Sequence, residues 1–261
     1  MDGKKNSTMS KIDNNTPVIV QTLATIVTLW FCLYGVNASA KPEEFPYFTA
    51  TYDANIKGLS AQATREFKPV NATLSELNFK ATSWLATLNE SAQFLWEDQL
   101  IQPIRFNYSR KIMGKESEKV LTFDPQNKKI ISTYKDKTYT LPNKDEALDY
   151  LSFQLQLQYD LLKYDQLKEK KSNVYRIADK DRIKEYRFEI MGDELVETEL
   201  GNLNTIKVKV IRENKNRATY LWLAKEWHHL LVRLEQHKNE KKEFEIQLTS
   251  ATVDGRKVAG Q

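Results

Sequence analysis

The sequence predicts a mainly β (α+β) protein, in which one strongly curved antiparallel meander sheet, a half-barrel, wraps around a single long helix. Three observations predict this fold. Apolar and polar residues alternate at period two along most of the chain, short polar segments separate these stretches, and residues 145–164 follow a helical period instead. The apolar face of such a sheet needs a cover, and the helical segment is the available one.

The strands are expected wherever the alternation is clear. Residues 47–57 place apolar side chains on one face and polar side chains on the other, as a half-buried strand does. The same pattern returns at residues 104–108, 186–190, 206–210 and 244–248. Residues 219–223 are apolar on both faces, which predicts a strand that is covered on both sides.

Short polar segments between these stretches predict tight turns and therefore sequential hairpins. They are Lys57-Gly58, Asp124-Pro125-Gln126-Asn127, Met191-Gly192-Asp193, Asn214-Lys215-Asn216 and Lys238-Asn239-Glu240.

One segment, residues 145–164, predicts the helix. Its apolar residues recur at helical spacing over nearly five turns: Leu148, Leu151, Leu155, Tyr159 and Leu162. Asn143 and Glu146 fit an N-cap and its partner at the third helical position. A helix that packs on the sheet should leave a groove between the two.

The first forty residues predict an export signal. Three lysines precede an apolar run at residues 18–36, and Ala38, Ser39 and Ala40 supply the small side chains that a signal peptidase requires. We expect cleavage after Ala40, which leaves residues 41–261 as a single β-rich periplasmic domain that does not span the membrane.

Two alternatives stay open for this segment. The run could serve as an uncleaved anchor, because it is just long enough to span a bilayer, although Gln21 and three threonines disfavour this. Met9 is a second candidate for the start beside Met1. The only cysteine, Cys32, would leave with the signal, and a mature chain without cysteine is typical of the periplasm of a Gram-negative bacterium.

Charge and motifs exclude several classes of function. The 39 basic and 35 acidic residues are interleaved, so the chain lacks the basic stripe of a nucleic-acid-binding protein. G-x-S-x-G, G-x-G-x-x-G and P-loop motifs do not occur, and the three histidines lack the spacing of metal ligands. We therefore expect no catalytic residues, no metal and no cofactor.

Aromatic side chains are the one notable excess, and they give the candidate ligand-binding residues. If some of them line the groove or its mouth, they would form an apolar pocket with few polar groups. The alternative is core packing, which is the usual role of aromatic residues in β proteins. The candidates are Trp84, Phe94, Trp96, Tyr159, Trp222, Trp227 and His228.

Several segments resemble an exported proteobacterial family that is catalogued as a domain of unknown function. They lie at residues 47–65, 84–88, 105–110, 148–151, 197–205, 221–224 and 231–236, and together they cover nearly all of the expected mature chain. The resemblance implies a periplasmic protein whose fold is similar to the lipoprotein carriers of the Lol system. In those carriers a curved sheet encloses helices around an apolar cavity.

These observations lead to two functional hypotheses. The first is a non-enzymatic carrier that holds a lipid or an acylated protein in the groove between sheet and helix. The alternative is a cell-envelope scaffold with a filled core, which binds another protein through a sheet edge and holds no ligand. The oligomeric state stays open.

Overall fold

The computed structural model describes residues 42, 45–56, 59–143, 146–167, 174–211 and 216–261. The expected export signal and its cleavage point after Ala40 lie outside the described residues, as do the expected turn at Lys57-Gly58 and most of the one at Asn214-Lys215-Asn216.

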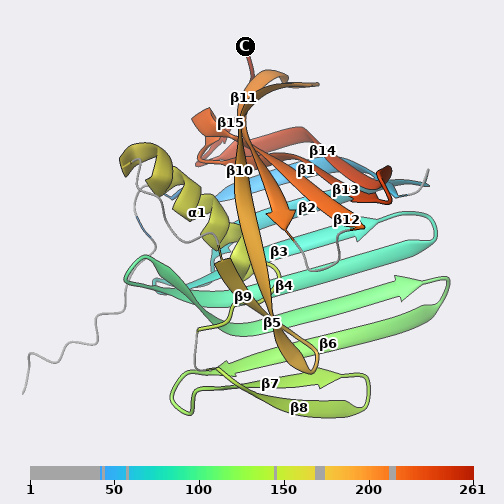
Figure 1. The fold of residues 1–261 in the computed structure, drawn as a ribbon, viewed down its shortest axis with the longest axis vertical. Helices are drawn as coiled ribbons and strands as arrows, with labels where there is room; N and C mark the ends of the chain where they lie inside the picture. The colour runs from blue at the N-terminus through green and yellow to red at the C-terminus, as the bar shows by residue number, and fades with distance from the viewer. Residues whose placement is uncertain (1–41, 43–44, 57–58, 144–145, 168–173, 212–215) are drawn as a thin grey trace, which may run out of the picture. The chain divides into compact units, whose positions relative to one another are not determined.

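Fifteen strands in the described part of the chain form one large antiparallel sheet (Figure 1). The first eight are β1 Phe48–Ile56, β2 Leu59–Pro69, β3 Leu74–Thr82, β4 Ala86–Glu97, β5 Leu100–Ile112, β6 Lys115–Asp124, β7 Lys129–Tyr134 and β8 Lys137–Pro142. The others are β9 Val174–Asp179, β10 Arg182–Thr198, β11 Gly201–Ile211, β12 Arg217–Ala224, β13 Leu230–Lys238, β14 Lys241–Val253 and β15 Arg256–Lys257. A 3-10 turn, η1 Lys225–Trp227, separates β12 from β13.

The sheet consists of two meanders that meet in its middle. The strand order is β8-β7-β6-β5-β4-β3-β2-β1-β14-β13-β12-β11-β10-β9, and β15 pairs with β14 off this path. Within each meander every strand pairs with its neighbour in the chain. The first and the last long strand, β1 and β14, join the meanders in a register that pairs Phe48 with Val253. The predicted antiparallel meander is therefore confirmed.

Contacts outside the strand ladder bring the far parts of the two meanders together. The Lys119 ammonium of β6 lies 2.8 Å from the Asp179 carboxylate of β9, although these strands are near opposite ends of the strand order. Leu148, which precedes the helix, forms an isolated bridge with Ile177 of β9.

The helix, α1 Ser152–Leu167, begins seven residues later than the pattern predicts. Asp149 is the residue that caps it: its carboxylate accepts bonds from the backbone N–H groups of Leu151 and Ser152, both at 2.9 Å. Glu146, the expected partner of an Asn143 cap, has a left-handed backbone at φ 51°. Leu148 forms a bridge with β9 instead, so the leucine spacing there does not mark a helix.

Side chains of α1 pack into the core against both meanders. The Tyr159 ring lies 5.7 Å from Phe45 and 5.4 Å from Trp96 of β4, and Phe153 stacks on Tyr186 of β10 at 6.1 Å. No helix among the described residues is long and apolar enough to cross a membrane.

The turn predicted at Met191-Gly192-Asp193 is wrong, because β10 runs through it. A shift in the β10–β11 register between Ile190 and Gly192, with Gly192 at φ 116°, identifies a β-bulge. A bulge and a turn share the same glycine signal, which explains the error. The turns after Asp124 and Lys238 and the burial of β12 on both faces agree with the prediction.

Candidate functional site

An apolar recess of about 240 Å³ lies on the inner face of the sheet, the face that carries Phe67 and Phe106 and packs into the core. Its lining comes from β1–β5 and β14, and nearly all of the lining surface is carbon. The lining residues are Ala54, Ala61, Ala63, Phe79, Ala81, Thr82, Ser83, Ala86, Thr87, Leu88, Arg110, Ile112, Phe244 and Ile246.

The recess exists because alanines occupy neighbouring inward positions on three strands. The register pairs Ala54 of β1 with Ala61 of β2, and Ala63 of β2 with Ala81 of β3. Four methyl groups thus stand where larger side chains would fill the space between sheet and core. Apolar hollows of this kind bind ligands by shape and by burial of hydrocarbon.

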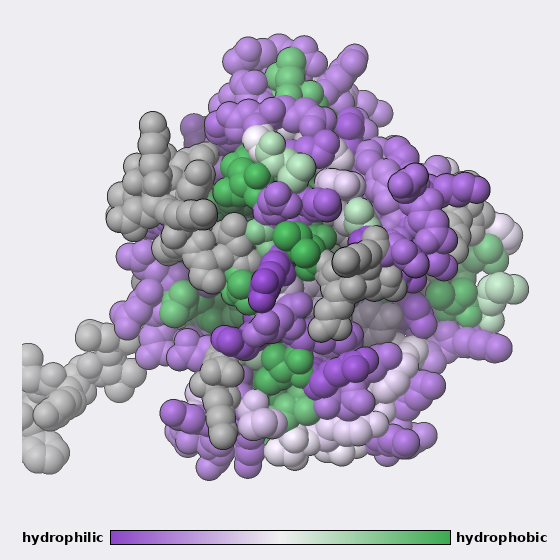
Figure 2. Space-filling view, in the orientation of Figure 1, coloured by the Kyte–Doolittle hydropathy of each residue, from purple (hydrophilic) through white to green (hydrophobic). Residues whose placement is uncertain are grey.

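Exposed apolar side chains surround one end of the recess. Trp84 in the β3–β4 turn is 80% exposed, and Met113 in the β5–β6 turn is 77% exposed. The Met113 N–H donates to the carbonyl of Leu85 at 3.0 Å, which holds the two turns together. Ser83 and Ile112, beside these residues, belong to the lining. Figure 2 shows hydrophobic surface at the edge where β5 and β6 meet.

A buried arginine lies next to the recess. Arg65 of β2 is 3% exposed and points to the inner face between Ala63 and Phe67. Its guanidinium carbon lies 5.5 Å from the centre of the Phe48 ring. Burial lowers the pKa of Arg65 and raises the pKa of the neighbouring Tyr52 to about 12, against the charge of the arginine.

A second, polar cavity of about 560 Å³ lies on the same face, between β4–β7 and the β9–β10 hairpin. Its central feature is the pair of Lys119 with Asp179, whose carboxylate also bonds Lys184 at 2.6 Å. Burial acts to raise the pKa of Asp179, but the hydrogen bonds and charges of the two lysines outweigh it and lower the pKa to about 2.

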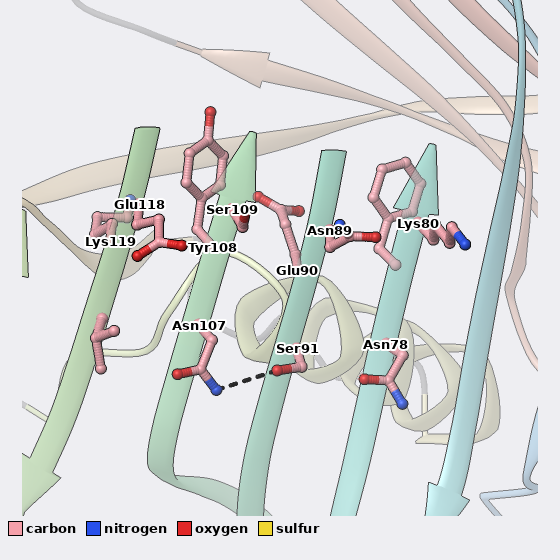
Figure 3. Close-up of a pocket in the computed structure, with 12 residues that line it drawn as sticks. Asn78, Lys80, Asn89, Glu90, Ser91, Asn107, Tyr108, Ser109, Glu118 and Lys119 are labelled. Atoms are coloured by element: carbon pink, nitrogen blue, oxygen red, sulfur yellow. Dashed lines mark hydrogen bonds between the residues drawn. The ribbon is translucent and has the colours of Figure 1, made fainter. Parts of the chain in front are cut away.

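Glu90 of β4 lines this cavity and has a carboxyl group that titrates near neutral pH. Burial raises the pKa of Glu90 to about 7, in spite of the opposing charge of Lys119. Figure 3 shows Glu90 beside Tyr108, its cross-strand neighbour on β5, with the bonded pair of Asn107 and Ser91 on the opposite side of the two strands. Such a carboxyl group could accept or release a proton.

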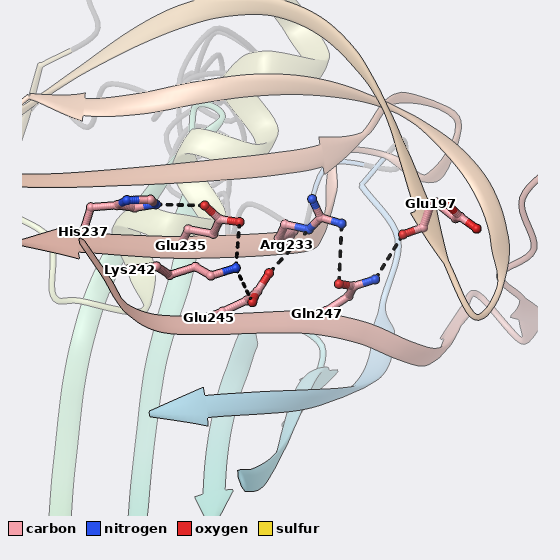
Figure 4. Close-up of polar contacts among 7 residues, drawn as sticks. All are labelled: Glu197, Arg233, Glu235, His237, Lys242, Glu245 and Gln247. Atoms are coloured by element: carbon pink, nitrogen blue, oxygen red, sulfur yellow. Dashed lines mark hydrogen bonds and ion pairs between the residues drawn. The ribbon is translucent and has the colours of Figure 1, made fainter. Parts of the chain in front are cut away.

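The outer face of β13 and β14 carries a network of charged side chains (Figure 4). His237 lies 2.8 Å from Glu235, and Lys242 bonds Glu245 at 2.6 Å. In the described residues no group of three His, Cys, Asp or Glu side chains could hold a metal ion. The network is partly buried, with the Glu235 and Glu245 side chains 16% and 25% exposed, and it extends to β10 through the bond that Gln247 donates to the Glu197 carbonyl at 3.0 Å.

A family model described as "Protein of unknown function (DUF3108)" matches residues 48–240. The chain belongs to this family. The match runs from β1 to the turn before β14, so it includes the alanines of the recess, Arg65 and Glu90. No curated protein matches the chain.

Three of the predicted ligand-binding residues of this DUF3108 chain come together in the core. Phe94, Trp96 and Tyr159 are at most 1% exposed, and the Trp96 ring packs edge to face against Phe94, Tyr159 and Phe45. They line no part of the recess. Their position is that of aromatic core packing, which is the alternative that the sequence left open.

The other four candidates do not form one site, although Trp227 and His228 are adjacent in the chain. Trp84 is at the rim of the recess, and Trp222 is buried with the Lys207 ammonium 4.7 Å from its ring centre. Trp227 donates from its indole nitrogen to the Ala259 carbonyl at 3.2 Å. His228 has a left-handed backbone at φ 53°, and its carbonyl accepts a bond from Gln158 of α1.

Two features of this family member escaped the sequence reading although the signal for them was present. Alanine recurs at inward positions of β1 to β3, which indicates a hollow rather than a filled core. Arg65 stands in the same inward series as Ala63 and Phe67, where a charged side chain is unusual.

Proposed function

We propose that this chain is a non-enzymatic binding or carrier protein that holds a hydrophobic ligand, a lipid or the acyl chain of a lipidated protein, in the alanine-lined recess. The observation that carries the proposal is the recess itself, an apolar hollow of about 240 Å³. Each methylene group of an acyl chain that enters it would contribute about 0.8 kcal/mol. Useful affinity therefore needs little specific polar chemistry.

We further propose that the sheet forms a half-barrel around α1, similar to the Lol lipoprotein carriers. Two contacts support this. Lys119 meets Asp179 across the two meanders, and α1 packs against Trp96 of one meander and Tyr186 of the other through Tyr159 and Phe153. In this arrangement the recess lies on the inner face, beside the helix-covered core.

The proposed site differs from the one that the sequence favours. The sequence places the ligand between helix and sheet, among aromatic side chains. The recess lies instead over Ala54, Ala61, Ala63 and Ala81, and of the aromatic candidates only Trp84 is next in the chain to a lining residue, Ser83.

Native mass spectrometry tests the proposal. The protein is expressed from the full-length gene in a Gram-negative host, purified without detergent, and measured before and after organic extraction. We expect an added mass that extracts into solvent. Ala81→Leu fills the recess and should reduce the added mass, whereas Ala259→Leu, on an exposed residue, should not. The proposal would be contradicted if Ala81→Leu kept the full added mass. It would also be contradicted if the wild type carried no added mass and took up no apolar dye.

An envelope scaffold is the second candidate, and the exposure of Trp84 and Met113 favours it, because exposed apolar side chains at a rim mark many protein interfaces. A stable protein partner, recovered without lipid and lost on Trp84→Ala, would support the scaffold over the carrier.

Export to the periplasm is part of the proposal. We expect cell fractionation to recover the protein in the periplasm. The N-terminal sequence of this periplasmic form should begin at Lys41. A start within residues 1–40 would contradict cleavage after Ala40.

A further inference from the structure

We propose that Arg65, together with Tyr52, binds the anionic head group of the ligand, and that the ligand class is a long-chain carboxylate. This inference rests on the proposed function, because it assigns a head group to the molecule whose chain occupies the recess.

The charge of Arg65 is not compensated by any carboxylate among the described residues. A guanidinium that is only 3% exposed has lost its hydration, and buried cations are normally paired with a carboxylate. Among the described residues, none forms an ion pair with Arg65. Glu66 lies on the outer face and bonds Lys68 at 2.8 Å. Glu90 is two strands away in the same cross-strand row, roughly 10 Å at the usual strand spacing.

Two nitrogen atoms of the Arg65 guanidinium are free to donate. The Nε and Nη2 atoms of Arg65 make no hydrogen bond within the described part of the chain. These two atoms form the side-on edge of the guanidinium, where two N–H bonds point in parallel. That edge is the arrangement that receives both oxygens of a carboxylate. The Tyr52 hydroxyl is buried beside Arg65, with which it interacts, and it supplies a third donor.

Arg65 and Tyr52 lie next to residues that line the recess. Arg65 lies directly across from Phe79 on β3 and two residues from Ala63 on β2, and both of these line the recess. Tyr52 is the cross-strand partner of Ala63 on β1. Neither Arg65 nor Tyr52 lines the recess, but a carboxylate that they hold would lie beside residues that do, so that its hydrocarbon chain can extend into the alanine-lined space.

The single charge of Arg65 favours a carboxylate over other anionic head groups. One guanidinium neutralises one negative charge, so a monoanionic carboxylate leaves the buried site neutral. A phosphate dianion would leave a net charge in a desolvated position, which is costly. A neutral head group would leave the buried charge of Arg65 without a counter-ion.

Titration calorimetry with three probes of equal chain length tests the inference. The probes are dodecanoate, dodecanol and dodecyl phosphate, each below its micelle concentration, and the protein is purified from cells that carry the full-length gene. We expect the wild type to bind dodecanoate at least about tenfold more tightly than dodecanol, because charged hydrogen bonds in a dry site are strong. Dodecyl phosphate should bind more weakly than dodecanoate.

Variants assign this preference to the two residues. Arg65→Met should abolish the preference for dodecanoate and leave the affinity for dodecanol within about threefold. Arg65→Lys, which keeps the charge and loses the parallel donors, should recover only part of it. Tyr52→Phe should weaken dodecanoate alone. Lys68→Met, on the outer face of the same strand and 45% exposed, is the control and should change nothing.

The outcomes separate this inference from the function on which it rests. Equal wild-type affinity for dodecanoate and dodecanol overturns the head-group site and leaves the carrier function intact. Tighter binding of dodecyl phosphate overturns the carboxylate assignment. Failure to bind any probe overturns the carrier function itself. If Arg65→Met does not fold, the wild-type selectivity and Tyr52→Phe still decide the question.

Discussion

Lys119 on β6 donates a 2.8 Å hydrogen bond to Asp179 on β9, and so joins strands that stand near opposite ends of the strand order. The Lys119 side chain is 6% exposed and that of Asp179 11%. A second lysine, Lys184, bonds the other carboxylate oxygen of Asp179 at 2.6 Å. The interaction is therefore a three-residue group, in which Lys119 and Asp179 are desolvated, that links the two meanders without any backbone ladder.

Replacing Lys119 by methionine should destabilise the protein by about 2–3 kcal/mol. The change keeps the apolar stem and leaves the buried Asp179 carboxylate with Lys184 alone, so the loss is smaller than for a carboxylate that has no partner left. Urea unfolding measures it. Lys111→Met, in the exposed 3.7 Å pair with Glu116, is the control and should cost less than about 0.5 kcal/mol. Similar losses in both variants would show that the buried group adds no stability.

Glu90 should make the folded state less stable as the pH rises from about 4.5 to about 7. The pKa of this carboxyl is about 7 in the folded protein, whereas its ordinary value, which applies to the unfolded chain, is 4.5. Over this range the folded state therefore holds a proton that the unfolded state has released. Its contribution is complete below pH 4.5 and is lost as the pH passes the folded pKa.

The variant Glu90→Gln removes this dependence. It should be more stable than the wild type by about 2 kcal/mol at pH 8 and nearly equal to it at pH 4, as measured by urea unfolding at both values. Glu118→Gln, an exposed carboxylate on β6, serves as the control. A Glu90→Gln variant that is less stable at pH 8 would contradict the prediction.

Filling the recess should weaken ligand binding without unfolding the protein. Ala81 is only partly buried, so a leucine there can occupy the hollow without displacing the core. We expect Ala81→Leu to bind an apolar fluorescent dye at least about fivefold more weakly, through loss of buried hydrocarbon contact. Its melting temperature should stay within a few degrees of the wild type. Unchanged dye binding would show that the dye occupies another place.

Two tryptophans that the sequence groups together should respond in opposite ways. Trp96 is 1% exposed in the aromatic cluster, so Trp96→Ala should cost about 3–5 kcal/mol of stability. Trp84 is 80% exposed, so Trp84→Ala should cost less than about 0.5 kcal/mol and act on ligand uptake instead. Urea unfolding and dye-uptake kinetics separate the two effects. A large loss of stability on Trp84→Ala would refute its placement at the rim.

Gly260 should tolerate no side chain. A Cβ atom at this position would lie 2.5 Å from the Asn202 carbonyl oxygen, and Gly260 donates a bond to the Leu200 carbonyl at 2.6 Å. Gly260→Ala should therefore detach the C-terminal residues from the start of β11 and break the bond from Trp227 to Ala259. Faster hydrogen exchange at Asn202 and a red shift in tryptophan fluorescence report this. Ala259→Ser, on the exposed neighbour, should change neither.

The strands could be predicted from the sequence because alternation at period two depends on a local property, namely which residues face the core. The two local errors have one cause. The glycine at Gly192 fits a turn as well as a bulge, and the leucine spacing before Ser152 fits a helix as well as extended backbone. Tertiary contacts decide in both places. Pairing with β11 keeps β10 continuous, and the bond of Leu148 with β9 holds that residue in extended backbone.

The site was harder to predict because its residues are defined by space rather than by chemistry. A tryptophan such as Trp96 has the composition of a ligand pocket and fills the core, whereas Ala63 has no such character and lines the hollow. Only the register, which sets Ala63 beside Ala81 and Phe79 beside Arg65, reveals that small side chains and a buried cation adjoin.

The pairing of β1 with β14 has a consequence for how the chain reaches its native state. Every other neighbouring pair of long strands is also adjacent in the chain and can pair locally and early, but Phe48 can pair with Val253 only across all the strands between them. Until then β1 presents a bare edge to any other chain in its vicinity. The rate of folding, and the danger of aggregation before folding is complete, should thus depend on β14 rather than on β1.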